Sequence, residues 1–72
     1  MDSIQIRDDF IKLGQALKLA GLVDSGVEAK EAITSGKVKL NGTTELKRGK
    51  KIVDGDVVEY KNNKFSVFGK KA

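Results

Sequence analysis

The residues of this 72-residue chain that could do chemistry are mainly its cationic side chains. Residues 30–51 carry seven basic side chains against two acidic ones, whereas residues 1–29 and 52–60 are net acidic. The seven are Lys30, Lys37, Lys39, Lys47, Arg48, Lys50 and Lys51. Lys37 and Lys39 alternate with apolar residues, and side chains two apart on a strand lie about 6–7 Å apart on one face. Lysine contacts phosphates as a point charge, so this block predicts a site for a polyanion.

Enzymatic and metal chemistry have little support in the composition. The chain has no cysteine and no histidine, which excludes disulfides and thiolate metal sites and removes the most common general base. Asp54 and Asp56 flank Gly55 and could hold a hard cation, but a turn is the more frequent role of such a triplet. We therefore expect no catalytic residue, no metal site and no cofactor.

The aromatic residues are few: Phe10, Tyr60, Phe65 and Phe68, with none inside the basic block. Proteins that bind single strands normally interleave aromatic rings with cations, so that bases can stack. Their absence from the block favours recognition of the shape and backbone of a folded RNA. The phenylalanines are interpreted as core residues.

Two helices are predicted in the first half of the chain, after a short strand over residues 3–6. Apolar residues at Phe10, Leu13, Leu17 and Ala20 form one helical stripe, with Asp8 and Asp9 as candidate caps and Gly21 as the stop. The second helix opens with Ser25 and Glu28, the spacing of a capping box. Its stripe is Ala29, Ala32 and Ile33, and it ends at Gly36.

The second half has the period-two pattern of strands. Residues 37–40 alternate basic and apolar side chains, and Asn41-Gly42 is a strong hairpin-turn dipeptide. A basic loop over residues 47–51, a turn at residues 54–56 and strands over residues 57–60 and 65–68 follow, before a tail over residues 69–72 that is expected to fray. The predicted fold is one α+β domain over residues 1–72: two packed helices followed by a small, mostly antiparallel sheet.

An ordered set of residues within this pattern matches a known motif. Its steps are Ser25, Ala29, Ile33, Gly36, Val38 and Leu40-Asn41-Gly42, with Lys12-Leu13 and Leu17 upstream and Gly55-Asp56-Val57-Val58-Glu59 downstream. The set resembles the RNA-binding domain named after small-subunit ribosomal protein S-four, also called the αL motif, over residues 10–60. Leu40 replaces a valine of the family pattern. The chain is similar to the small stand-alone bacterial version of this domain.

The resemblance implies a surface for structured RNA, either ribosomal or transfer RNA, and the ribosome or its subunits as partners of a monomer. Its residues at or beside RNA-facing positions are Lys12, Ser25, Lys30, Lys37, Lys39 and Asn41. Arg48, Lys50 and Lys51 extend the patch on grounds of charge alone. Ser25 and Asn41 are also explained more simply as a helix cap and a turn residue. The pattern is broken at Gly26, where the family commonly has arginine, and at Gly14, where it has an acidic residue.

Several other functions remain open on the sequence. A ubiquitin-like sulphur carrier shares the valine-asparagine-glycine type of turn, although this chain ends in Gly69-Lys70-Lys71-Ala72 and lacks a terminal Gly-Gly. A protein–protein adaptor and a helix-turn-helix DNA binder are also compatible with the helix pair. No secretory signal and no membrane span is visible, so we expect a cytoplasmic protein that binds RNA without catalysis.

Overall fold

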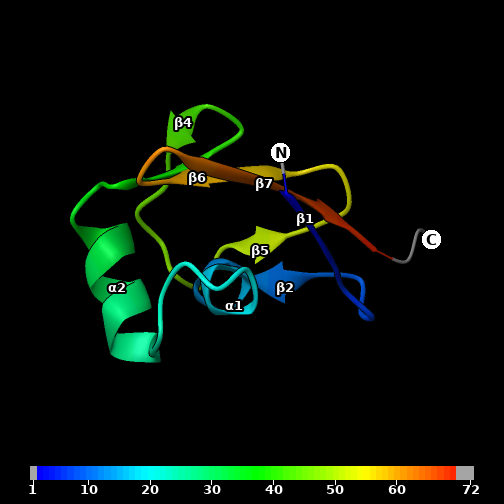
Figure 1. The fold of residues 1–72 in the computed structure, drawn as a ribbon, viewed down its shortest axis with the longest axis horizontal. Helices are drawn as coiled ribbons and strands as arrows, with labels where there is room; N and C mark the ends of the chain where they lie inside the picture. The colour runs from blue at the N-terminus through cyan, green and yellow to red at the C-terminus, as the bar shows by residue number, and fades with distance from the viewer. Residues whose placement is uncertain (1, 70–72) are drawn as a thin grey trace.

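The computed structural model describes residues 2–69 and combines two helices with two β-sheets (Figure 1). The elements in chain order are β1 (Asp2–Gln5), β2 (Ile11–Lys12), α1 (Leu13–Leu19), α2 (Gly26–Thr34), β3 (Val38–Leu40), β4 (Thr43–Thr44), β5 (Lys51–Ile52), β6 (Val57–Tyr60) and β7 (Asn63–Phe68). The predicted α+β class and the order of helix pair and sheet are confirmed.

The larger sheet has five strands in the order β1-β7-β6-β3-β4. β1 runs parallel to β7 at one edge, and every other pair in this sheet is antiparallel. β2 and β5 form a separate antiparallel ribbon. Figure 1 shows the helices and this ribbon on the same side of the larger sheet, so the other face of the sheet is left uncovered.

The core lies between the helix layer and the covered face of the sheet. Its fully buried side chains include Leu13 and Leu17 from α1, Ile33 from α2 and Val38 from β3. Within residues 2–69 no charged residue is buried, and the buried residues are all aliphatic or aromatic. Every cation of the described chain is therefore at the surface, and its role depends on its neighbours there.

The first helix begins later than the sequence pattern indicates. α1 starts at Leu13, because residues 11 and 12 pair with β5 instead of continuing a helix from Asp8 or Asp9. The N–H groups of Leu13 and Gly14 donate to the carbonyl oxygens of Lys50 and Arg48, at 2.9 and 3.1 Å. The basic loop thus satisfies main-chain donors at the start of α1, a task that a capping side chain often performs. The predicted stop is confirmed: Gly21 has φ +78°.

The second helix follows the prediction closely. Ser25 caps α2, since its hydroxyl oxygen accepts a hydrogen bond from the Glu28 N–H at 3.1 Å. The Glu28 carboxylate accepts from the N–H of Asp24 at 2.9 Å, one residue before the partner that a capping box predicts. The stripe of Ala29, Ala32 and Ile33 is buried, as expected.

The aromatic residues divide between core and surface. Phe65 and Tyr60 are buried, but Phe10 is 37% and Phe68 44% exposed, so the assignment of all the phenylalanines to the core is wrong. Phe10 lies outside the core because the residues that follow it form the ribbon strand β2, whereas the prediction placed Phe10 on the buried stripe of a longer α1. Phe68 lies on β7 one position after the buried Val67, and alternation turns its side chain to the uncovered face.

The turns are mostly where the sequence predicts them. Asn41 and Gly42 both have positive φ, 51° and 86°, as a tight hairpin between β3 and β4 requires. The last hairpin turns at Lys61 and Asn62, which have φ 51° and 64° and lie between the predicted strands over residues 57–60 and 65–68. Of the tail expected to fray, residues 70–72 lie outside the described residues. Gly69 is held, because its N–H donates to Asp54 Oδ1 at 3.0 Å.

Candidate nucleic-acid interface

A hollow of about 320 Å³ opens where α1, the start of α2 and the basic loop meet. We call it the glycine hollow, because three of its lining residues are glycines. It is lined by Lys12, Gly14, Gln15, Lys18, Gly26, Ala29, Arg48 and Gly49. Its walls therefore come from three segments that are far apart in the sequence.

The hollow exists because the helices and the loop approach closely at residues with little or no side chain. A Cβ atom placed on Gly14 would lie 3.8 Å from the Cβ of Ala29 and 3.8 Å from the Arg48 carbonyl oxygen. The small alanine therefore permits the close helix packing that the sequence predicts. At Gly26, a Cβ atom would have no neighbouring atom within 4 Å. A ligand backbone can approach the main chain here without meeting side chains.

Three cations and no carboxylate line the glycine hollow: Lys12, Lys18 and Arg48. Lys12 also lies directly opposite Lys51 in the β2–β5 ribbon. Like charges directly opposite each other on antiparallel strands destabilise the pairing. The buried Ile52 of β5 shows that the other face of this ribbon packs on the core. The two lysines thus share the solvent face, where an anionic ligand would relieve their repulsion.

Only some of the predicted site residues belong to this surface. Lys12 and Arg48 line the hollow itself, and Lys51 extends it along the ribbon. The side chain of Lys50 is exposed on the same loop, whose main chain holds α1. The fold therefore brings Lys12, predicted from the motif, together with Arg48 and Lys51, predicted from charge alone.

The strand lysines of the prediction lie elsewhere. Lys39 is exposed on β3 next to the buried Val38, so it projects from the uncovered face of the sheet. Its register partner on β6 is Glu59. Lys37 borders a separate hollow whose lining includes Glu28 and Glu31. These surroundings are of mixed charge, unlike those of the glycine hollow.

The remaining predicted residues are on α2 and in the hairpin turn. Lys30 is exposed on α2 and does not line the glycine hollow. Ser25 uses its hydroxyl oxygen to cap α2. Asn41 donates from its amide to Asp56 Oδ1 at 3.0 Å, and its amide oxygen accepts from the Val57 N–H at 2.8 Å. Both ends of the Asn41 side chain are therefore engaged within the fold.

Lys18 lines the hollow but was not predicted from the sequence, because it lies in an acidic segment of the chain. Gln15 and Lys18 are three residues apart on α1 and both are exposed, while Ala16 and Leu17 are buried between them. Residues three apart share one face of a helix. The spacing of Gln15 and Lys18 could have indicated a shared polar face of α1, but the net acidic charge of residues 1–29 concealed it.

Across residues 2–69, no histidine, cysteine or acidic side chains gather in a group of three that could hold a metal ion. In the same range, neither helix is long and apolar enough to cross a membrane.

The family of this fold is shown by comparison with known proteins. The family model of the S4 domain matches residues 4–68, and the chain belongs to the S4 domain family. The match spans both helices and both sheets, and it agrees with the resemblance found on the motif residues.

Individual relatives place the chain more closely within this family. It is 43% identical over 56 residues to the "Probable ribosome maturation protein RlbA" of Bacillus subtilis (strain 168), covering 78% of this chain and 79% of that one. It is 39% identical over 57 residues to the "Putative RNA-binding protein YbcJ" of Escherichia coli (strain K12), covering 79% and 81%. The solution structure of YbcJ, described as revealing an αL motif involved in RNA-binding, superposes with a TM-score of 0.73 at 33% identity, over 94% of this chain and 87% of that one.

Proposed function

We propose that this protein is a non-catalytic, single-domain RNA-binding protein that docks structured RNA through the glycine hollow. The observation that carries the proposal is the meeting of Lys12, Lys18 and Arg48 around a floor of glycines with no carboxylate in the lining. Such a concave, basic surface suits a phosphate backbone, which dominates the affinity of most nucleic-acid complexes.

The chemistry of the hollow favours backbone contacts over base reading. Arg48 can contact a phosphate with two parallel N–H groups, while Lys12 and Lys18 act as point charges. The open space around Gly26 lets the sugar-phosphate chain lie close to the main chain. Contacts of this kind position a folded RNA without specifying its sequence, so shape must select the target.

The names of two relatives are the reason to propose ribosomal RNA as the target. RlbA is named as a ribosome maturation protein and YbcJ as an RNA-binding protein. We propose that the chain acts as a monomer on ribosomal RNA, on the ribosome or its subunits in the cytoplasm, with transfer RNA as the second candidate. No feature of the described residues favours the sulphur carrier, the adaptor or the DNA binder over this function.

Filter binding across a salt series tests the proposal. A folded ribosomal RNA fragment, a transfer RNA and a DNA duplex of matched length are compared at several salt concentrations. We expect tight binding to folded RNA that weakens linearly on a logarithmic salt scale, with a slope of about −0.9 for each phosphate contact in duplex regions. Equal, weak binding to all three polyanions would contradict the proposal.

A further inference from the structure

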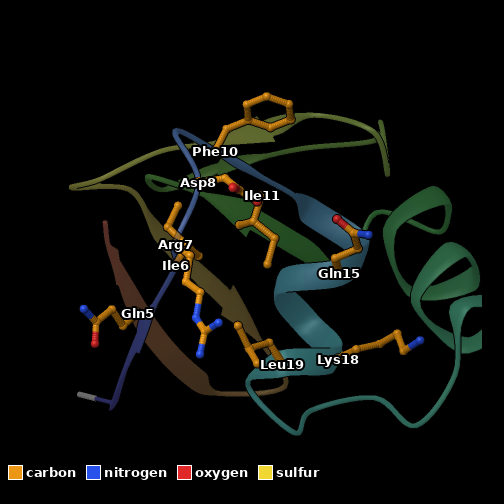
Figure 2. A pocket seen from close by; sticks show the side chains of 9 residues that line it. All are labelled: Gln5, Ile6, Arg7, Asp8, Phe10, Ile11, Gln15, Lys18 and Leu19. Carbon is orange, nitrogen blue, oxygen red and sulfur yellow. The ribbon is translucent and has the colours of Figure 1, made fainter. Parts of the chain in front are cut away.

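A second hollow, of about 640 Å³, lies on the other side of α1 (Figure 2). It is bounded by α1 and by the segment that connects β1 to β2, and Figure 2 shows Phe10 at one end and Leu19 at the other. Together with Ile11, these residues give it an apolar wall, and we call it the apolar hollow. Leu19 is 57% exposed, so a large apolar side chain stands open to solvent here.

The apolar hollow adjoins the glycine hollow. Gln15 and Lys18 line both, so the exposed face of α1 forms a ridge between them. The lining of the apolar hollow also carries two cations, Arg7 and Lys18, against the single carboxylate of Asp8. A ligand that fills the apolar hollow therefore meets both apolar surface and positive charge.

Phe10 supplies the aromatic ring that the basic block lacks in the sequence. The Nζ atom of Lys51 lies 4.8 Å from the centroid of the Phe10 ring, within the range of a cation–π contact. Lys51 in turn lies opposite Lys12, which lines the glycine hollow. The fold thus brings an exposed ring beside Lys51, a cation about forty positions away in the chain, in the combination that stacks unpaired bases.

We propose that one unpaired base of the bound RNA enters the apolar hollow and stacks against Phe10, while the adjoining phosphates occupy the glycine hollow. This inference rests on the proposed function and adds a preference within it: helical RNA that carries a bulged nucleotide, over the same helix fully paired. A base has an apolar face and a negatively charged backbone attached to it, which matches an apolar wall rimmed by Arg7 and Lys18.

The experiment uses three RNAs that differ at one position. The first is a fully paired hairpin, the second has a single bulged adenosine, and the third has an abasic residue in the bulge, which keeps the phosphates and removes the base. Fluorescence anisotropy gives the dissociation constant of each for the whole protein. We expect the adenosine bulge to bind about 5- to 100-fold more tightly than the abasic bulge, the range of a base–aromatic stack.

Variants assign this difference to the ring. Phe10→Ala should abolish the preference for the adenosine bulge, and Phe10→Trp should retain it. Phe68→Ala is the matched control, because Phe68 is similarly exposed and does not line the hollow. Thermal unfolding of each variant shows that the fold is kept.

The outcomes separate this inference from the proposed function. The double variant Lys12→Gln/Arg48→Gln should weaken all three RNAs by a similar factor and leave the preference for the base intact. Equal affinity of the wild-type protein for the adenosine and abasic bulges would overturn the stacking site. The apolar hollow would then bind a protein partner or no ligand, and the proposed function would stand. The stacking site would also be overturned if Phe10→Ala weakened all three RNAs equally. If the wild-type protein bound none of the three RNAs, both the stacking site and the proposed function would be overturned.

Discussion

The glycine hollow and the uncovered face of the sheet both carry lysines, but they place them in opposite surroundings. In the hollow, Lys12 and Lys18 have Arg48 as a neighbour and no carboxylate in the lining. On the sheet, Glu59 of β6 lies in register between Lys39 of β3 and Lys64 of β7. The excess of positive charge in the middle of the sequence therefore does not mark a site by itself. The strand register decides which cations are left for a ligand.

The difference also concerns what each set of charges does for the fold. Opposite charges across neighbouring strands stabilise a sheet by roughly 0.2–1 kcal/mol per pair. The row of Lys39, Glu59 and Lys64 fits this role. Lys12 and Lys51, paired in register, have the opposite effect on the ribbon. A repulsion of this kind is tolerable where binding of an anion offsets it.

The largest predicted effect is on RNA affinity when two charges are removed from the hollow. Lys12→Gln/Arg48→Gln should lower the affinity for folded RNA by about 10- to 100-fold at low salt. It should also make the salt slope less steep by roughly 0.9 for each duplex phosphate that the variant no longer neutralises. The stability of the free protein should not fall, because Lys12 no longer repels Lys51. Filter binding and thermal unfolding measure the two quantities.

The matched control removes the same number of charges from the sheet. Lys39→Gln/Lys64→Gln changes the net charge equally, so any effect of overall charge is shared by the two variants. We expect less than about a 3-fold loss of affinity, together with a small loss of stability, because Glu59 no longer has a cation opposite it on either neighbouring strand. If the sheet variant lost as much affinity as the hollow variant, the contrast between the two regions would be wrong.

The second prediction concerns stability, at the hairpin turn after β3. Asn41→Ala should lower the free energy of unfolding by about 2 kcal/mol, because it removes the bonds to Asp56 and Val57 and places alanine at φ 51°. Urea denaturation measures this loss. Asn41→Gly, which tolerates the positive φ but lacks the amide, should lose less.

RNA binding by the Asn41 variants sharpens the comparison of the two regions. Measured where both variants are fully folded, the affinity should stay within about 2-fold of the wild type, because both ends of the Asn41 amide are engaged in the fold. A tenfold loss in a folded variant would make Asn41 an RNA contact and would extend the interface to the sheet side of the molecule.

The third prediction separates capping from RNA contact at Ser25. Ser25→Ala should lower stability by about 1 kcal/mol through loss of the helix cap. Ser25→Asp keeps a capping oxygen and suits the helix dipole, so its stability should match that of the wild type. It nevertheless places a carboxylate beside Gly26 of the glycine hollow, and its RNA affinity should fall. If the aspartate variant bound RNA as well as the wild type does, the RNA interface would not extend to this end of α2.

The sequence predicts the parts of this fold that local chemistry determines. The cap at Ser25, the stop at Gly21 and the positive φ of the Asn41-Gly42 turn follow from residue type and near neighbours, and each is confirmed. The order of the elements and the fold class followed from the helical and period-two patterns, and the αL motif agreed with both. The start of α1 was missed because its partners, the carbonyl oxygens of Lys50 and Arg48, are more than thirty residues away.

The candidate site was predicted less well, for the same physical reason. Arg48 was identified from charge and Lys12 from the motif, but only the fold brings the two into one hollow. Lys18 was hidden by acidic neighbours in sequence that do not line the hollow. Phe10 was assigned to the core because its spacing fits a helix that does not extend that far. Cross-strand register and the path of a loop are long-range properties, and no local pattern specifies them.

The smallest predicted effect adds a charge to the hollow. Gly26 stands where the family commonly has arginine, and a Cβ atom at Gly26 would meet no other atom within 4 Å, so Gly26→Arg is a suitable way to add a guanidinium. We expect about a 3- to 10-fold gain in affinity for folded RNA and a salt slope steeper by roughly 0.9, the signature of one more neutralised duplex phosphate. Gly26→Ala is the control, because it changes the helix propensity without adding charge. If Gly26→Arg left both the affinity and the salt slope unchanged, RNA would not approach the α2 side of the glycine hollow. The phosphate contacts would then be confined to the side formed by Arg48 and the basic loop.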